Sequence, residues 1–118
     1  MDTRKHAAVF SVLSALALAP SVARAQATDP AVAQLWEAKC SKCHGLDGKA
    51  HTKTGARYKI DDFTSAKWQK EMDDAEIRKT IQNGVKSKKG KVQMPAFKGK
   101  LGEDQVAALI AYVRSFGK

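Results

Sequence analysis

The sequence predicts a small all-α domain in which helices are separated by long loops, and three observations support this class. Apolar residues recur at helical spacing in residues 103–116. Aspartate, a favourable N-cap, stands at two places where helices would begin, Asp29 and Asp73. Glycines gather between these segments, and no stretch alternates convincingly between apolar and polar residues as a half-buried strand does.

Residues 1–25 have the pattern of a secretory signal peptide. Arg4 and Lys5 form a basic start, residues 7–19 are mainly apolar, and residues 23–25 (Ala-Arg-Ala) fit a small-x-small cleavage site. The apolar run is shorter than the about 18 residues typical of a spanning helix, although an uncleaved membrane anchor is the alternative. We therefore expect cleavage after position 25 and one domain over residues 26–118.

The first helix of that domain is expected to begin at Asp29, with Pro30 at the first helical position, where proline is tolerated. Its apolar stripe contains Ala31, Leu35, Trp36 and Ala38. Residues 45–62 are rich in glycine and polar groups and are expected to form an irregular loop, with Tyr58 and Ile60 packed inward. Residues 65–72 are compatible with a short helix that carries Trp68.

Residues 73–76 (Asp-Asp-Ala-Glu) resemble a capping box and predict another helix. Ile77 and Ile81 give it an apolar face, and Gly84 ends it. Residues 85–102 hold three glycines and six lysines and are expected to be a loop. The last helix is expected over residues 103–116, and its apolar face consists of Val106, Leu109, Ile110 and Val113.

The chain is strongly basic, with 21 lysines and arginines against 12 aspartates and glutamates. Such a charge suggests an acidic protein partner or another anionic surface. Export and the lack of a recognition motif argue against nucleic acid. No second long apolar run follows the leader, so no stable membrane insertion is expected, and nothing in the sequence requires more than a monomer.

Residues 40–44 (Cys-Ser-Lys-Cys-His) carry the most informative motif. Two thiols separated by two residues and followed by histidine are typical of covalent haem attachment. One tight backbone turn would bring Cys40 and Cys43 to the two vinyl groups of haem, and His44 would bind the iron. A local disulfide is the alternative for two cysteines in an exported protein.

Met94 is the expected second iron ligand. It is followed by Pro95, which stiffens the backbone, and thioether opposite imidazole is the ligand pair of electron-carrying cytochromes. Met72 is interpreted as a packing residue at the edge of a short helix. His51 is a rival ligand, but it lies so close to His44 in the sequence that its loop would have to wrap round the ring edge, and a solvated histidine is favoured.

These motifs resemble a class I c-type cytochrome of the bacterial, single-haem kind with His/Met ligation. The resemblance is carried by residues 40–45, by residues 94–97 (Met-Pro-Ala-Phe) and by residues 109–113 (Leu-Ile-Ala-Tyr-Val), and it covers nearly all of residues 26–118. It implies the small cytochrome c fold, with helices and long loops wrapped round one haem.

The resemblance also implies the ligands. One haem c would be attached through Cys40 and Cys43, and its iron would be bound by His44 and Met94. Arg57, Tyr58 and Trp68 are weaker candidates for partners of the haem propionates.

The family packs its first helix closely against its last. An aromatic residue four positions before the first cysteine, here Trp36, meets a pair on the last helix, here Leu109 and Tyr112. Two departures are visible. Val32 stands where a small residue is frequent, so the crossing is expected to be looser or shifted by a turn. No proline follows His44 closely, which leaves open the acceptor for its Nδ1 proton.

The expected function is that of a soluble single-haem electron carrier in the periplasm, not an enzyme, because two protein ligands leave no open iron position. Lys39 and Lys42, together with lysines in residues 86–91 and 98–100, would steer an acidic redox partner; simple solvation of loops is the alternative.

Three other functions are alternatives. The chain could be a haem-containing subunit of a larger oxidoreductase complex, or a ligand-binding haem protein associated with one. It could be a haem enzyme or ligand sensor in which Met94 is labile. A thioredoxin-like dithiol without haem expects a βαβ setting that this sequence lacks.

Overall fold

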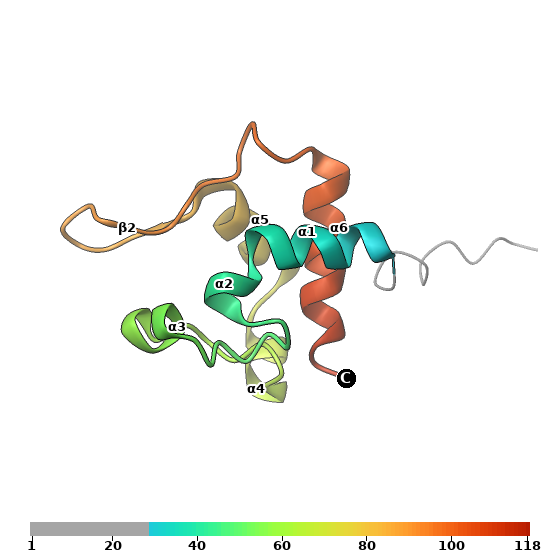
Figure 1. The fold of residues 1–118 in the computed structure, drawn as a ribbon, viewed down its shortest axis with the longest axis horizontal. Helices are drawn as coiled ribbons and strands as arrows, with labels where there is room; N and C mark the ends of the chain where they lie inside the picture. The colour runs from blue at the N-terminus through green and yellow to red at the C-terminus, as the bar shows by residue number, and fades with distance from the viewer. Residues whose placement is uncertain (1–28) are drawn as a thin grey trace, which may run out of the picture.

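The computed structural model describes residues 29–118, so the predicted signal peptide and its cleavage site lie outside the described residues. Helices dominate the described part, as predicted, and a two-stranded sheet is added to them (Figure 1). In chain order the elements are α1 (Pro30–Lys39), α2 (Ser41–His44), α3 (Lys53–Tyr58), α4 (Ala66–Glu71), α5 (Asp74–Asn83), β1 (Val85–Lys86), β2 (Val92–Met94) and α6 (Glu103–Ser115). Within residues 29–118, no helix has both the length and the apolar character needed to cross a membrane.

The crossing of α1 and α6 organises the fold (Figure 1). Asp29 starts α1 as predicted, because its carboxylate accepts a hydrogen bond from the Ala31 N–H at 2.9 Å. Val32 and Trp36, one turn apart, are buried in the crossing. Val32 is therefore accommodated in the core. The expected stripe was wrong at Ala31 and Ala38, which are exposed, because the position of α6 decides which face of α1 is covered.

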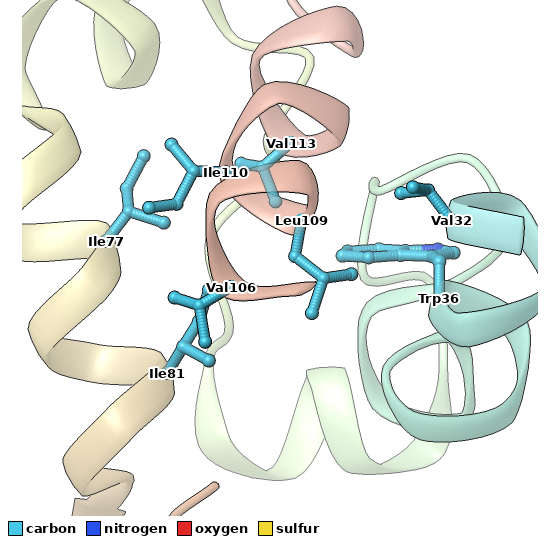
Figure 2. Packing of buried hydrophobic residues seen from close by; sticks show 8 residues of the cluster. All are labelled: Val32, Trp36, Ile77, Ile81, Val106, Leu109, Ile110 and Val113. Carbon is cyan, nitrogen blue, oxygen red and sulfur yellow. The ribbon is translucent and has the colours of Figure 1, made fainter. Parts of the chain in front are cut away.

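Helix α6 is the centre of the hydrophobic core (Figure 2). On one side Ile77 and Ile81 of α5 pack against it, and on the other side Trp36 approaches Leu109. The predicted apolar face is confirmed, since all four of its residues are at most 5% exposed: Val106, Leu109, Ile110 and Val113. Burying a large aliphatic side chain of this kind contributes about 1.5–3 kcal/mol, so α6 joins α1 and α5 into one body.

Arg114, near the end of α6, ties that helix to α4 and to the start of α5. Its guanidinium donates to the Asp74 carboxylate at 2.7 Å, to the Gln69 carbonyl at 2.9 Å and to the Met72 carbonyl at 2.6 Å. The Gln69 side-chain amide returns a bond to the Val113 carbonyl at 3.0 Å. Hydrogen bonds from a charged donor are stronger than neutral ones, so this cluster holds α4 against the core.

Residues 45–62 are not the uniform loop that was expected, because they contain α3. The Thr52 hydroxyl caps the helix by accepting from the Gly55 N–H at 2.8 Å. Gly55 is buried against the carbonyl of Ala50, where a Cβ atom would collide with that oxygen. The glycine that suggested a loop is therefore required for close packing inside a helix. Tyr58 and Ile60 are partly buried, as predicted.

Residues 85–94 form an antiparallel hairpin, so the prediction of a loop was wrong for this segment. Val85 pairs with Met94 and Lys86 with Val92, with one irregularity between them. The turn is closed by the Ser87 N–H, which donates to the Lys91 carbonyl at 2.8 Å. Strands of two and three residues are too short for an alternating pattern to be visible in the sequence.

Candidate haem site

The Cys-Ser-Lys-Cys-His motif forms α2, a single helical turn. The N–H groups of Cys43 and His44 both donate to the carbonyl of Cys40, at 3.2 and 3.0 Å. Positions three apart lie on the same side of a helix, so the two cysteines are presented together. The tight turn expected from the spacing is therefore confirmed. The two cysteines are not joined by a disulfide, and burial, with a smaller effect from Cys43, raises the pKa of the unreacted Cys40 thiol to about 11.

Three successive carbonyls, those of the last two residues of this motif and of the glycine that follows it, accept hydrogen bonds from different parts of the chain. The Cys43 carbonyl accepts from the Thr52 hydroxyl at 2.6 Å, and the carbonyl of the next residue accepts from the Ala50 N–H at 2.9 Å. The Gly45 carbonyl accepts from the indole N–H of Trp36 at 3.0 Å. The orientation of the turn is thus determined by α1, by the loop after α2 and by the start of α3.

The imidazole of His44 packs against two aromatic rings that also contact each other. Phe63 stacks on it with centroids 4.9 Å apart and an angle of 25°, and Trp36 lies at 5.8 Å. Burial lowers the pKa of His44, which favours the neutral form that binds metals. Its Nδ1 atom is buried, with no hydrogen-bond partner among residues 29–118. Phe63 was not recognised from the sequence, although it is a lone aromatic in a polar segment.

One cavity of about 360 Å³ brings the predicted site residues together. It is lined by Cys40, Cys43 and His44 from the start of the domain and by Met94 from β2. The remaining wall is mainly apolar and includes Ile60, Phe63, Ile77, Ile81, Leu109 and Val113. Its size lies within the range of about 300–1,000 Å³ that is usual for ligand sites. An apolar cavity with thiols, imidazole and thioether in its wall fits a haem.

The weaker candidates from the sequence, for propionate partners and for a rival iron ligand, differ in whether they line the cavity. Tyr58 and Trp68 line the cavity, whereas Arg57 and His51 are exposed and do not line it. The indole N–H of Trp68 is buried without a partner among the described residues. Leaving such a donor unpaired costs about 1–3 kcal/mol, so a ligand with a carboxylate would satisfy a group that the protein leaves open. Met72 also lines the cavity.

The backbone around Met94 is held by α5 and β1. Met94 pairs with Val85 across the hairpin, and the Phe97 N–H donates to the Ile81 carbonyl at 3.0 Å. Gly84, which ends α5 as predicted, has φ +67°. A Cβ atom on Gly84 would lie 2.8 Å from backbone atoms of the two residues after Met94. The end of α5 therefore fits closely against the segment that positions the thioether.

The sequence model of one family, described as cytochrome c oxidase, cbb3-type, subunit III, matches residues 27–113. The chain belongs to this family. As a c-type cytochrome domain it holds haem c, with its iron, through covalent bonds. The class I single-haem assignment and the small, mostly helical cytochrome fold expected from the sequence are both confirmed.

Similar proteins include two curated relatives and a solved structure. The cbb3-type cytochrome c oxidase subunit FixP of Azorhizobium caulinodans is 34% identical over 85 residues, which cover 72% of this chain and 26% of the relative. FixP of a Bradyrhizobium species is 29% identical over 116 residues, which cover 98% of this chain and 37% of that relative. The chain thus spans between about a quarter and somewhat more than a third of the length of these relatives. The KustC0563 c-type cytochrome is 34% identical, with a TM-score of 0.63 and coverage of 73% of this chain and 96% of that one.

Proposed function

We propose that Cys40 and Cys43 attach the haem and that His44 and Met94 are its two iron ligands. The observation that carries this proposal is the single cavity lined by all four side chains. The thiols come from one helical turn, and the thioether comes from a strand far along the chain. The ligand pair is the one that electron-carrying cytochromes use.

The function that this site supports is one-electron transfer. The haem supplies the iron couple, which exchanges one electron between its ferric and ferrous states. The protein keeps the ligands in place: Phe63 and Trp36 hold the ring of His44, and the end of α5 holds the segment of Met94. Apolar walls exclude water, which together with the thioether raises the reduction potential. No substrate position is needed for this chemistry.

The setting that we propose is a haem-carrying subunit of a larger oxidoreductase complex. The two FixP relatives, named as subunits of cbb3-type oxidases, favour this over the free carrier expected from the sequence. A free single-haem carrier is the second candidate. It is favoured by the KustC0563 cytochrome, because the matched domain makes up 96% of that chain.

The proposal includes export. Removal of residues 1–25, haem attachment in the periplasm and an acidic redox partner are consistent with the basic composition and with a c-type cytochrome domain. The intact mass of the purified protein after acid and organic solvent reports the cleavage site and the covalent haem together.

Separation of membranes from periplasmic fluid under native conditions distinguishes a subunit of a larger complex from a free carrier. A subunit is expected to remain with gently solubilised membranes and to migrate, by haem stain and by antibody, in a band far larger than the 12.8 kDa of the full 118-residue sequence. A free carrier would leave with the osmotic-shock fluid as a small haem protein. Recovery of all the protein in that fluid would contradict the subunit and support the carrier.

Gly84→Ala is expected to weaken ligation by Met94. The new Cβ atom would press on the backbone after Met94, and alanine is strained at φ +67°. We expect loss or shift of the sulfur-to-iron absorption band of the oxidised protein, together with a lower reduction potential, while haem attachment persists.

Gly90→Ala is the matched control for this prediction. Gly90 also has positive φ, +77°, but a Cβ atom there meets nothing within 4 Å. Alanine at position 90 has the same backbone strain but makes no contact with the segment of Met94. The sulfur-to-iron absorption band of Gly90→Ala is therefore expected to remain. Equal spectra for the two variants would show that Gly84 does not position Met94.

A further inference from the structure

The side chain of Gln69, in α4, joins the end of α6 to the segment before α4. Its Nε2 atom donates to the Phe63 carbonyl at 2.7 Å and to the Val113 carbonyl at 3.0 Å. Its Oε1 atom accepts from the Arg114 guanidinium at 3.0 Å. Both donor hydrogens and the acceptor oxygen of the amide are therefore used, and the Phe63 carbonyl is held at a fixed place relative to α6.

The ring of Phe63 is held by the same helix as its backbone. Trp68, the neighbour of Gln69 in α4, contacts the Phe63 ring with centroids 4.4 Å apart. On the imidazole of His44 the Phe63 ring stacks at 4.9 Å and 25°. Two adjacent side chains of α4 thus determine where Phe63 lies, and Arg114 fastens α4 to α6 by donating to backbone carbonyls of that helix and of the residue after it.

His44 depends on this support because a usual source of orientation is missing. A histidine that binds a metal nearly always donates its second ring N–H to a carbonyl, carboxylate or water, and that bond fixes the ring plane. The Nδ1 atom of His44 is buried and has no partner among residues 29–118. The contact with Trp36 is longer and more tilted than the one with Phe63, at 5.8 Å and 45°. Within the described part of the chain, Phe63 is therefore the closest aromatic group that orients the imidazole.

We propose that Gln69 is a positioning residue for electron transfer, which sets the plane of the His44 imidazole by holding Phe63 against it. This inference rests on the proposed function, in which His44 binds the haem iron. The groups that orient an axial ligand are among the means by which a protein adjusts a haem. Gln69 does not line the haem cavity, so it acts on the iron ligand only through its neighbours.

The test is proton magnetic resonance of the intact ferric holoprotein, with cyanide bound to the iron in place of Met94. Cyanide is cylindrically symmetrical, so the order and spacing of the shifted haem methyl resonances report the plane of the imidazole. Gln69→Leu is similar in size and makes none of the side-chain bonds, and we expect its methyl resonances to change in spacing. In the matched control, Gln82→Leu, the wild-type pattern should remain. Gln82 bonds α5 to α6 through the Glu103 carboxylate, at 2.9 Å, and does not line the cavity.

A double substitution shows whether Gln69 acts through Phe63. Phe63→Leu is expected to change the methyl pattern by itself, and adding Gln69→Leu to it should change the pattern little further, because residues that act in series are not additive. A further change as large as that of Gln69→Leu alone would overturn the route through Phe63. A wild-type pattern in Gln69→Leu, or an equal change in Gln82→Leu, would overturn the positioning role, since the latter would mean that loosening any helix contact is sufficient.

The ferrous protein without cyanide tests the proposed ligation separately. A methionine bound to the iron lies above the haem ring, and the ring current shifts its methyl signal far upfield. If wild type lacks this signal, the proposed ligand pair fails, together with the inference that rests on it. If wild type shows the signal and Gln69→Leu keeps the wild-type pattern in the cyanide form, only the role of Gln69 fails.

Discussion

Met94→Ala is expected to lower the reduction potential of the holoprotein and to remove the sulfur-to-iron absorption band. Axial ligands and their surroundings span a range of about 0.8 V in haem proteins, and loss of thioether moves the potential downward. The variant also has an open iron position, so the reduced protein should bind carbon monoxide at neutral pH. Potentiometric titration and difference spectra with the gas measure both effects.

Met72→Ala is the control for this result, because Met72 lines the same cavity and belongs to the same residue type. It lies after α4, so its removal should alter packing while the absorption band and the closed iron position remain. If Met72→Ala loses the band and Met94→Ala keeps it, the second ligand is Met72. If the wild-type protein binds carbon monoxide as readily as Met94→Ala, the iron has a labile ligand, and a haem enzyme or ligand sensor is favoured.

Trp36→Ala is expected to destabilise the domain by about 3–5 kcal/mol, as large aromatic truncations in cores do. Trp36 is 2% exposed and contacts the rings of Tyr112 and Phe116, with centroids 5.6 and 5.1 Å away. The variant also leaves the Gly45 carbonyl without its donor. Chemical unfolding followed by far-ultraviolet circular dichroism gives the free energy of unfolding.

Two further variants serve as references for the loss of unfolding free energy in Trp36→Ala. Leu46→Ala removes a side chain that is 65% exposed, and it should change the free energy of unfolding by less than about 0.5 kcal/mol. Trp36→Phe keeps an aromatic ring and loses the indole N–H, so its cost should lie between the other two. A cost for Trp36→Ala close to that of Leu46→Ala would show that the α1–α6 crossing does not depend on this side chain.

Short stretches of sequence were enough to predict the helix starts, the buried face of α6 and the turn that carries the cysteines. The starts of α1 and α5 follow from Asp29 and Asp73, whose carboxylates accept hydrogen bonds from the first turn. The face of α6 follows from its spacing, because its four apolar residues are the ones that meet α5 on one side and Trp36 of α1 on the other. The turn at residues 40–44 could be predicted from the motif, because haem attachment requires both cysteines on one side of the backbone.

The remaining features depend on contacts between distant parts of the chain. Gly55 was interpreted as a loop residue, and only the carbonyl of Ala50 explains why a helix needs glycine there. The hairpin is made by pairing across a turn, and neither of its short strands has a pattern of its own. Phe63 lies against His44 because its segment is held by hydrogen bonds to distant residues: its carbonyl accepts from the Gln69 side chain of α4, and its N–H donates to the Gly48 carbonyl.

The three hydrogen-bonded carbonyls of the haem-attachment turn have a consequence for biogenesis. Their donors are Trp36, Ala50 and Thr52, all of them groups of the polypeptide, so contacts with α1 and with the segment before α3 stabilise the turn in addition to its bonds to haem. The turn keeps Cys40 and Cys43 on one side of the backbone. Once one thioether exists, the second bond closes a ring at high effective concentration, with little further loss of entropy. Folding of this segment thus prepares the chain for two covalent bonds in succession.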